Sequence, residues 1–381
     1  MQFTINRNAF IKKLNDVSRA IAAKTTIPIL SGLRMELTQA GLTLTGSNSD
    51  ISIESFLSAN DEKNALLVTE PGAIVVPAHI FSEITKRLPD ETMTIQVNNE
   101  TLLTTITSGQ SEFNINGSDA NTYPHLPDIT AENQLTLNAN VLKELISQVV
   151  IAVSNQETRP ILTGVHFIIN DGKLMAVATD SHRLAQRKLE LGELPKDVEY
   201  DVVIPGKSLL ELSRMLTDNM NDITMRISDK QVLFILGDTS FYSQLLPGKY
   251  PDTTRLIPTS ANTTIEFEAR TLLAAIERAS LMSHAGHNNI VRLVLNPEQQ
   301  SAVLSSNSPE IGKVEENLAF VSLEGASLDI SFNPDYMKDA LRSFGQSTIT
   351  IGFTAALRPF TLEPSEDHEH FIQLITPVRT A

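Results

Sequence analysis

The stretch TIPILSG at residues 26–32 has a close echo, TRPILTG, at residues 158–164, an offset of 132 positions. A second pair of phrases keeps the same offset: GSNSDISIE at 46–54 and ATDSHRLAQ at 178–186. One recurring apolar phrase can arise by chance, but two phrases at one offset indicate a repeated structural unit.

A third, weaker copy reads NNIVRLVL at 288–295 and SSNSPEIGK at 305–313. Polar, turn-rich segments near residues 130 and 260 mark the expected boundaries between copies. The sequence therefore predicts three similar domains, at residues 1–130, 131–259 and 260–381.

A finer period divides each copy in two. Six times, an extended apolar segment leads into a helical pattern, with an apolar residue at the junction and another five positions later. The six pairs are Ile5/Phe10, Val76/Phe81, Leu137/Leu142, Ile204/Leu209, Phe267/Leu272 and Phe332/Met337. Between these helices the chain alternates apolar and polar residues and is broken by Gly, Asn and Asp turns, as in hairpins. Each unit is expected to be β-α-β-β-β, which makes the chain an α+β protein with two units per domain.

Composition narrows the class of protein. The chain has 381 residues, 41% of them hydrophobic, and no cysteine, so disulfide scaffolds, thiol catalysis and Cys-ligated zinc are excluded. We expect no secretory signal and no membrane span, since no window has the roughly 18 apolar residues that a span needs. The formal net charge of −15 argues against nucleic-acid binding when it is taken alone.

The distribution of charge gives a different indication. All six predicted helices carry Lys or Arg, although acidic residues on the same helices also fit an ordinary solvated face. If the six helices faced one direction, their cations would form a weakly positive band. A ring of repeated units lined by these helices could hold a DNA duplex loosely enough to slide.

The order and spacing of these motifs resemble those of the bacterial DNA polymerase III beta subunit family, the sliding DNA clamps. The similarity extends over MQFTINRNAFIKKL, TIPIL, ATDSHRLA, GKYPDTTRLIP and the terminal TPVR. It implies the DNA clamp fold, with two chains joined head to tail in a ring that has its helices inside and its sheets outside.

The resemblance also implies the function. The protein would be a cytoplasmic, non-catalytic processivity factor without cofactor or metal, encircling double-stranded DNA of any sequence and tethering the replicative DNA polymerase. A clamp-loader ATPase would open the homodimer, and other proteins with a clamp-binding motif would share its binding pocket. Accordingly, the chain contains no GxxxxGK[ST] motif of its own.

The family's partner-peptide pocket lies between the second and third domains, and its residues carry over by motif. They are Arg159, Leu162, Thr179, Ser181, His182, Arg183, Leu184, Pro251, Arg255, Leu256, Leu374, Ile375, Thr376, Pro377, Val378 and Arg379. Such a pocket takes a short linear peptide through apolar side chains. Thr376 stands where many members have Met.

Two more sets of residues follow from the resemblance. The DNA-binding residues would be Lys12, Lys24, Arg87, Gln156, Lys207 and Arg214. At the joint between subunits, Phe113 and Ile115 of one chain would meet Leu281 and Met282 of the other, with Glu112 and Lys313 as a candidate ion pair.

Three other interpretations compete with this one. Asp180, Ser181 and His182 contain the residue types of a hydrolase triad, but consecutive side chains point apart. His368 and His370, among Glu366, Asp367 and Glu369, could bind a metal or form a solvated loop. A repeat-built protein scaffold without a DNA role would also fit the acidic composition.

Overall fold

The computed structural model describes the chain except for residues 23, 127–128, 130–133, 192–198, 287 and 380–381. It forms two compact units, one of residues 1–140 and 214–245 and the other of residues 141–213 and 246–381. The predicted boundary between residues 130 and 131 lies outside the described residues, and the domain limits stay a prediction. We call the parts of the chain that contain β1–β9, β10–β17 and β18–β26 domains I, II and III, and we count the segment that follows β9 with domain I and the one that follows β17 with domain II.

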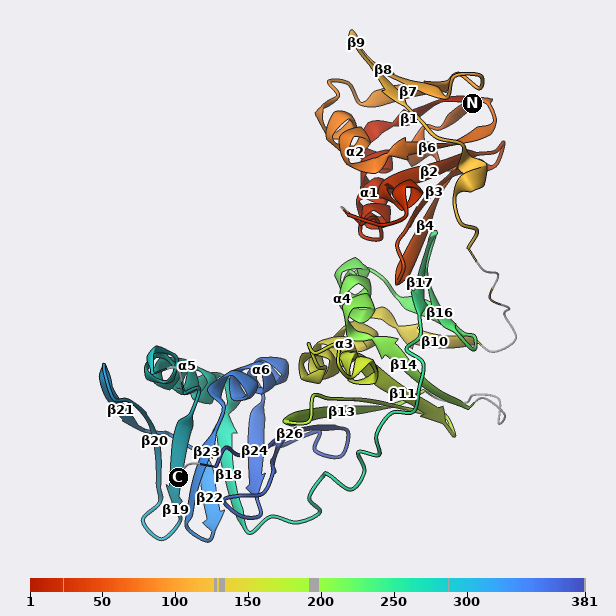
Figure 1. Cartoon of the computed structure of the whole chain (residues 1–381). Helices are drawn as coiled ribbons and strands as arrows, with labels where there is room; N and C mark the ends of the chain where they lie inside the picture. The colour runs from red at the N-terminus through yellow and green to blue at the C-terminus, as the bar shows by residue number, and fades with distance from the viewer. Residues whose placement is uncertain (23, 127–128, 130–133, 192–198, 287, 380–381) are drawn as a thin grey trace. The chain divides into compact units, whose positions relative to one another are not determined.

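The element order repeats the β-α-β-β-β unit six times (Figure 1). Domain I contains β1 (Gln2–Asn6), α1 (Arg7–Ser18), β2 (Gly32–Leu37), β3 (Gly41–Ser47) and β4 (Ile51–Ser58), then β6 (Gly72–Pro77), α2 (Ala78–Arg87), β7 (Thr92–Val97), β8 (Leu103–Ser108) and β9 (Ser111–Asn116). Domain II contains β10 (Gln134–Asn138), α3 (Ala139–Val149), β11 (Gly164–Asn170), β12 (Lys173–Thr179) and β13 (Arg183–Glu190), then β14 (Tyr200–Pro205), α4 (Gly206–Met215), β15 (Asp222–Ile227), β16 (Gln231–Leu236) and β17 (Thr239–Gln244).

Domain III follows the same plan with a longer first helix. It contains β18 (Thr263–Glu268), α5 (Ala269–Ala285), β19 (Val291–Asn296), β20 (Ser301–Ser308) and β21 (Gly312–Asn317), then β23 (Leu328–Phe332), α6 (Pro334–Phe344), β24 (Thr348–Phe353), β25 (Phe360–Pro364) and β26 (Phe371–Ile375). Two short strands, β5 (Leu67–Glu70) and β22 (Ser322–Gly325), were not predicted and pair with β1 and β18. The repeated phrases TIPILSG and TRPILTG form equivalent 3₁₀ turns, Pro28–Ser31 and Pro160–Thr163, that lead into β2 and β11.

The six predicted strand–helix junctions are confirmed. Each of the twelve apolar residues at these junctions is at most 4% exposed, because the strand and the helix bury the same side against one core. The junction at Asn333 and Pro334 is an N-cap with proline in the first turn, and the Asn333 side chain accepts a hydrogen bond from the Asp335 N–H.

The sheets continue from one domain into the next. In the compact unit of residues 1–140 and 214–245, β4 of domain I pairs antiparallel with β17 of domain II. The strand order of this sheet is β10-β15-β16-β17-β4-β3-β2-β6. In the compact unit of residues 141–213 and 246–381, β13 of domain II pairs with β26 of domain III. The strand order of this sheet is β14-β11-β12-β13-β26-β25-β24-β18-β22. The remaining sheets are β5-β1-β7-β8-β9 and β21-β20-β19-β23, in which β9 and β21 are outermost strands.

Side chains reinforce both of these joints. Across β4 and β17, the hydroxyls of Ser55 and Thr239 are hydrogen-bonded at 2.8 Å, and Lys13 of α1 donates to Thr239 at 3.2 Å. Near β13 and β26, the Gln373 side chain donates to the Gln148 carbonyl at the end of α3. Each joint therefore combines a backbone ladder with buried polar bonds that fix its register.

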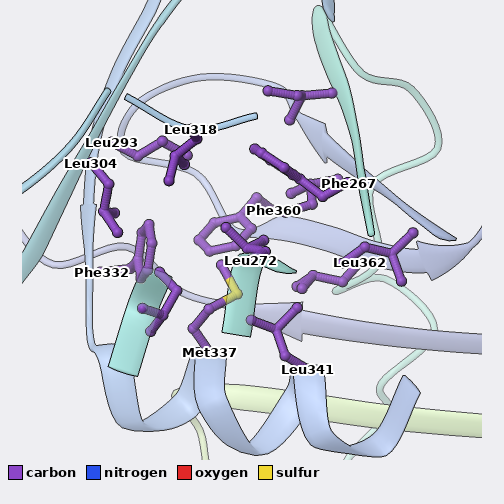
Figure 2. Packing of buried hydrophobic residues seen from close by; sticks show 14 of the residues in the cluster. Phe267, Leu272, Leu293, Leu304, Leu318, Phe332, Met337, Leu341, Phe360 and Leu362 are labelled. Atoms are coloured by element: carbon purple, nitrogen blue, oxygen red, sulfur yellow. The ribbon is translucent and has the colours of Figure 1, made fainter. Parts of the chain in front are cut away.

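The core of domain III lies between its helix pair and its strands (Figure 2). Phe332 and Phe360 meet there with ring centroids 5.6 Å apart, next to Met337 and Leu341 of α6. The helices α5 and α6 pack against one another, as do α1 and α2 in domain I. Among the described residues, no helix has the length and apolar character to span a membrane.

Candidate functional site

A cluster of buried apolar side chains lies where the β13–β26 joint meets β11, β12 and β14. Three of its members, Leu162, Leu184 and Leu374, were predicted as pocket residues from sequence. The others are Val177, Val203 and Tyr250, with Ile161, Leu246 and Ile257 packed partly buried against them. The predicted residues from TRPILTG, ATDSHRLA and the C-terminal strand are thus brought together by the fold.

Tyr250 ties this cluster to the end of β12. Its hydroxyl accepts a hydrogen bond from the backbone N–H of Thr179 at 3.0 Å, and its ring stacks on His166 at 4.8 Å. His166 in turn is hydrogen-bonded to Asp201 at 2.7 Å. Burial raises the pKa of Tyr250 to about 12, so the hydroxyl stays protonated at neutral pH.

A cleft of about 480 Å³ opens beside the cluster. Its walls are Val153, Ser154, Asn155, Gln156, Thr158, Arg159, Leu162, Asp180, Ser181, His182, Arg183 and Tyr336. Five predicted pocket residues and one predicted DNA contact, Gln156, therefore line a single opening. Arg159, Ser181 and His182 are exposed there, whereas Leu162 is buried at its floor.

The turn from Asp180 to Arg183 has a specific conformation. Ser181 has φ of 78°, in the left-handed region that a serine seldom adopts. Asp180 Oδ1 accepts from the backbone N–H groups of His182 and Arg183 at 2.9 and 3.0 Å, and Thr179 Oγ1 donates to the Arg183 carbonyl. These bonds stabilise a tight turn whose side chains face the cleft.

Thr376, in the C-terminal segment, is hydrogen-bonded to this turn. Its backbone N–H and its hydroxyl both donate to the His182 carbonyl, at 2.9 and 2.8 Å. A methionine at this position could make only the first of these bonds. The threonine thus gives the chain a second tie between the turn and the C-terminal segment.

The structure places the other predicted pocket residues around this centre. Pro251, Arg255 and Leu256 are exposed on the segment that follows Tyr250. Ile375 is buried in the core of domain III instead of the apolar cluster. The tail residues Pro377 and Val378 are half-buried, Val378 donates its N–H to the Ser331 carbonyl, and Arg379 is exposed.

The predicted DNA contacts are accessible. Lys12, Lys24, Arg87, Gln156, Lys207 and Arg214 are all exposed, the helical ones on α1, α2 and α4. Arg87 forms an ion pair with Glu83 one turn earlier on α2, which neutralises part of its charge. Lys13, by contrast, points at Thr239, and burial lowers its pKa.

The predicted subunit-joint residues lie on β9 and α5. Phe113 on β9 is 41% exposed and Leu281 on α5 is 65% exposed, both high for large apolar side chains. Ile115 and Met282 are half-buried beside them. One turn before Leu281, Arg278 makes a bidentate ion pair with Glu316 on β21.

The residues of the two chemical alternatives have other partners. Asp180 is bonded to Arg183, and the His182 ring stacks on Tyr336 at 6.3 Å, so each has a local packing role. In the second motif, Asp367 pairs with Arg187 and with His370. Over the described part of the chain, no group of three or more His, Asp or Glu side chains could hold a metal.

Domain I contains a counterpart of the apolar cluster. Leu30 and Tyr123 correspond to Leu162 and Tyr250, and they pack with Val75 and Ala120. The position that corresponds to Leu184 is Ser52, whose hydroxyl is bonded to Ser47 at 2.6 Å. The repeat therefore builds the same corner twice, but only the corner in domain II has leucines from both strands of a joint.

Sequence reasoning missed Val177, Val203, Tyr250 and Tyr336. The run MAVA at 175–178 carries a signal, because apolar residues at consecutive strand positions indicate that both faces are covered. Tyr336 has no such signal, since its position follows from how α6 meets the 180–183 turn.

Comparison with known families covers nearly the whole chain. Residues 1–127 match the model described as DNA polymerase III beta subunit, N-terminal domain; residues 136–252 match the central domain and residues 254–379 the C-terminal domain. The chain is 48% identical over 381 residues to the beta sliding clamp of Bacillus subtilis strain 168, covering 100% of both chains.

Solved structures give the same likeness. A crystal structure of the DNA polymerase sliding clamp from Bacillus subtilis matches with a TM-score of 0.96 and 47% identity over 100% of both chains. A DnaN sliding clamp from Pseudomonas aeruginosa bound to griselimycin matches with a TM-score of 0.91 and 26% identity, again over 100% of both chains.

Proposed function

The chain belongs to the DNA polymerase III beta subunit family and is a non-catalytic DNA sliding clamp with the three-domain clamp fold, and from this premise we propose how it works. Two copies close head to tail into a ring around duplex DNA in the cytoplasm, with the helices toward the DNA. The β13–β26 corner is the docking site for the replicative polymerase, the clamp-loader ATPase and other proteins with a clamp-binding motif.

The pairing of the two internal joints is the observation that carries the ring proposal. In each joint, the last strand of a domain's first unit pairs with the last strand of the next domain's second unit: β4 with β17, then β13 with β26. The strands left at the corresponding positions are β21 of domain III and β9 of domain I, both outermost in their sheets. Continuing the pattern joins β21 of one copy to β9 of a second copy.

The repeat also predicts the register of that joint. Equivalent positions in the three domains are identified by the residue that each faces in its own hairpin. In the last strands of the first β-α-β-β-β units, the equivalent pairs are Ile53 with Gly46, Ala185 with Ala178 and Val314 with Ser306. In the last strands of the second units, they are Phe241 with Phe234, Gln373 with Leu362 and Phe113 with Ile106. The internal joints set Ile53 opposite Phe241 and Ala185 opposite Gln373. The equivalent pair between copies is Val314 opposite Phe113, an apolar contact on the side of the sheet that α5 covers.

The same register sets Glu112 opposite Glu315, with Lys313 diagonal to Glu112. Like charges directly opposite each other destabilise a sheet, and a diagonal cation offsets that repulsion. The proposed ion pair between Glu112 and Lys313 agrees with this arrangement.

Engineered cysteines test the joint, and the absence of native cysteine makes the result specific. The double variant Glu112→Cys/Glu315→Cys should oxidise to a covalent dimer, because directly opposite Cβ atoms lie about 5 Å apart. The control Glu112→Cys/Val314→Cys has its thiols on opposite faces and should stay uncrosslinked. Crosslinking of the control alone would mean a slipped register, and a monomer in solution at micromolar concentration would contradict the ring.

Exposed cations on three helices support the DNA role: Lys12 on α1, Arg87 on α2 and Lys207 on α4. A weakly basic lining gives little affinity, so retention must come from topology. Clamp loaded by its loader onto a nicked circular DNA should remain bound and dissociate once the DNA is linearised. Equal retention on both forms would favour the scaffold interpretation.

Peptide docking rests on the apolar cluster beside the cleft. A short peptide with leucine and phenylalanine anchors can bury them on Leu162 and its neighbours. Fluorescence anisotropy with such a fluorescein-labelled peptide should show binding, competed by an excess of the unlabelled peptide. Leu162→Ala should weaken it about tenfold or more, since the lost side chain is a buried anchor. The matched control is Leu30→Ala, equally buried at the equivalent position in domain I, which should leave binding unchanged.

A further inference from the structure

The side chain of Arg183 lies at the centre of contacts between domain II and α6. Its Nε donates to Asp180 at 3.0 Å, its Nη1 donates to Asp339 at 2.7 Å, and its guanidinium lies 4.7 Å from the ring centre of Tyr336. The side chain is only 11% exposed. Arg183 therefore has little donor surface left with which to bind an incoming peptide.

Helix α6 supplies two of these three contacts. Tyr336 and Asp339 are three residues apart and so lie on one face of the helix. Tyr336 also stacks on the exposed ring of His182, the residue before Arg183. The helix thus contacts the 180–183 turn at two consecutive side chains, both of which border the cleft.

The local bonds of the turn hold only one nitrogen of the Arg183 guanidinium. Asp180 fixes the backbone of the turn and one nitrogen of the guanidinium. Asp339 fixes a second nitrogen from another domain, and two charged acceptors hold a planar guanidinium in one orientation. Without Asp339, only the Asp180 bond and the Tyr336 ring would orient the guanidinium, and the turn would lose its charged contact with α6.

We propose that Asp339 is a positioning residue for the peptide-docking site: it holds Arg183, and through Arg183 the turn that carries Ser181 and His182. This inference rests on the proposed docking function. Asp339 lies outside the predicted pocket, on a helix assigned to the DNA-facing side. Its other oxygen lies 3.8 Å from Arg342, which also pairs with Glu277 on α5.

The test compares Asp339→Asn with Asp335→Asn in the full-length chain. Asp335 is the matched control, because it forms an ion pair with Lys338 at 2.7 Å on the same helix and does not contact Arg183. Anisotropy with the fluorescein-labelled leucine/phenylalanine peptide should show about tenfold weaker binding for Asp339→Asn, equivalent to about 1.4 kcal/mol. Asp335→Asn should bind like the unmodified chain, and Asp339→Glu should recover most of the loss.

A double-mutant cycle separates positioning from general destabilisation. Once Arg183→Met has removed the guanidinium, Asp339→Asn should cause no further loss of affinity. Unchanged binding by Asp339→Asn, equal losses in the Asp335 control, no recovery with Glu, or additive losses in the cycle would each overturn the proposal. If the unmodified chain binds no peptide at all, it is the docking function that fails, and the two results are distinguishable.

Discussion

Two equivalent tyrosines, Tyr250 and Tyr123, allow a test with an internal control. Both are buried at corresponding corners of domains II and I. The Tyr250 hydroxyl accepts the Thr179 N–H, whereas the Tyr123 hydroxyl faces the backbone of Ser47 without a partner in hydrogen-bonding geometry. The substitutions Tyr250→Phe and Tyr123→Phe remove the same atom from these two environments.

The expected magnitudes differ because only one deletion leaves a buried donor unpaired. Thr179 is 6% exposed, so its N–H cannot regain water when the Tyr250 hydroxyl is lost. An unsatisfied buried donor costs roughly 1–3 kcal/mol. Removing the Tyr123 hydroxyl breaks no such bond and should change stability by less than about 0.5 kcal/mol, or increase it slightly.

Hydrogen exchange measured by mass spectrometry or NMR reports the local effect directly. In Tyr250→Phe, the Thr179 amide should exchange faster by about tenfold for each 1.4 kcal/mol lost. Affinity for the leucine/phenylalanine peptide should fall with it, since Thr179 leads into the turn that borders the cleft. Unchanged protection of Thr179, or equal losses for the two substitutions, would refute the reasoning.

Three further predictions follow from burial and charge. Phe332→Ala should destabilise domain III by about 3–5 kcal/mol in chemical denaturation, whereas Phe113→Ala, on a half-exposed strand edge, should chiefly raise the dimer dissociation constant measured by ultracentrifugation. Burial raises the pKa of Glu54, so Glu54→Gln should raise the melting temperature at neutral pH. This gain should shrink as the pH falls through the raised pKa, and it should be gone by about pH 4, where the carboxyl is protonated even in the unfolded chain. Burial raises the pKa of Tyr123 and Tyr250 to about 12, so stability measured by denaturation should fall as the pH rises from about 10 to about 12, and less steeply with Phe at both positions.

Local pattern was sufficient to predict the six strand–helix junctions and the repeat of three similar domains. Spacing such as Ile5 to Phe10 identifies a strand entering a helix, because both ends of the pair must face one core. The repeat at 132 residues then transfers each identification to the next copy. The apolar residues Leu162 and Leu184 came from motifs that recur in the family, and the fold brings them into one cluster.

Contacts between distant segments were beyond the reach of local pattern. Periodicity within β4 or β13 does not say which strand of another domain will pair with it, because many apolar strands are compatible with one edge. The bond between Arg183 and Asp339 joins residues 156 positions apart, and nothing in either local sequence indicates it. The short strands β5 and β22 were missed because edge strands of four residues carry little periodic signal.

The common strand pairing at the internal joints has a further consequence for how the proposed ring would come apart. The segments after β9 and β17 tether the domains on either side of each internal joint, so a joint that frays re-forms at a high effective concentration. No covalent tether would span the proposed joint of β21 with β9 of a second copy, so its closure would depend on the protein concentration. With three similar ladders, the untethered one is where we expect the ring to open, and dilution alone should shift it toward single chains.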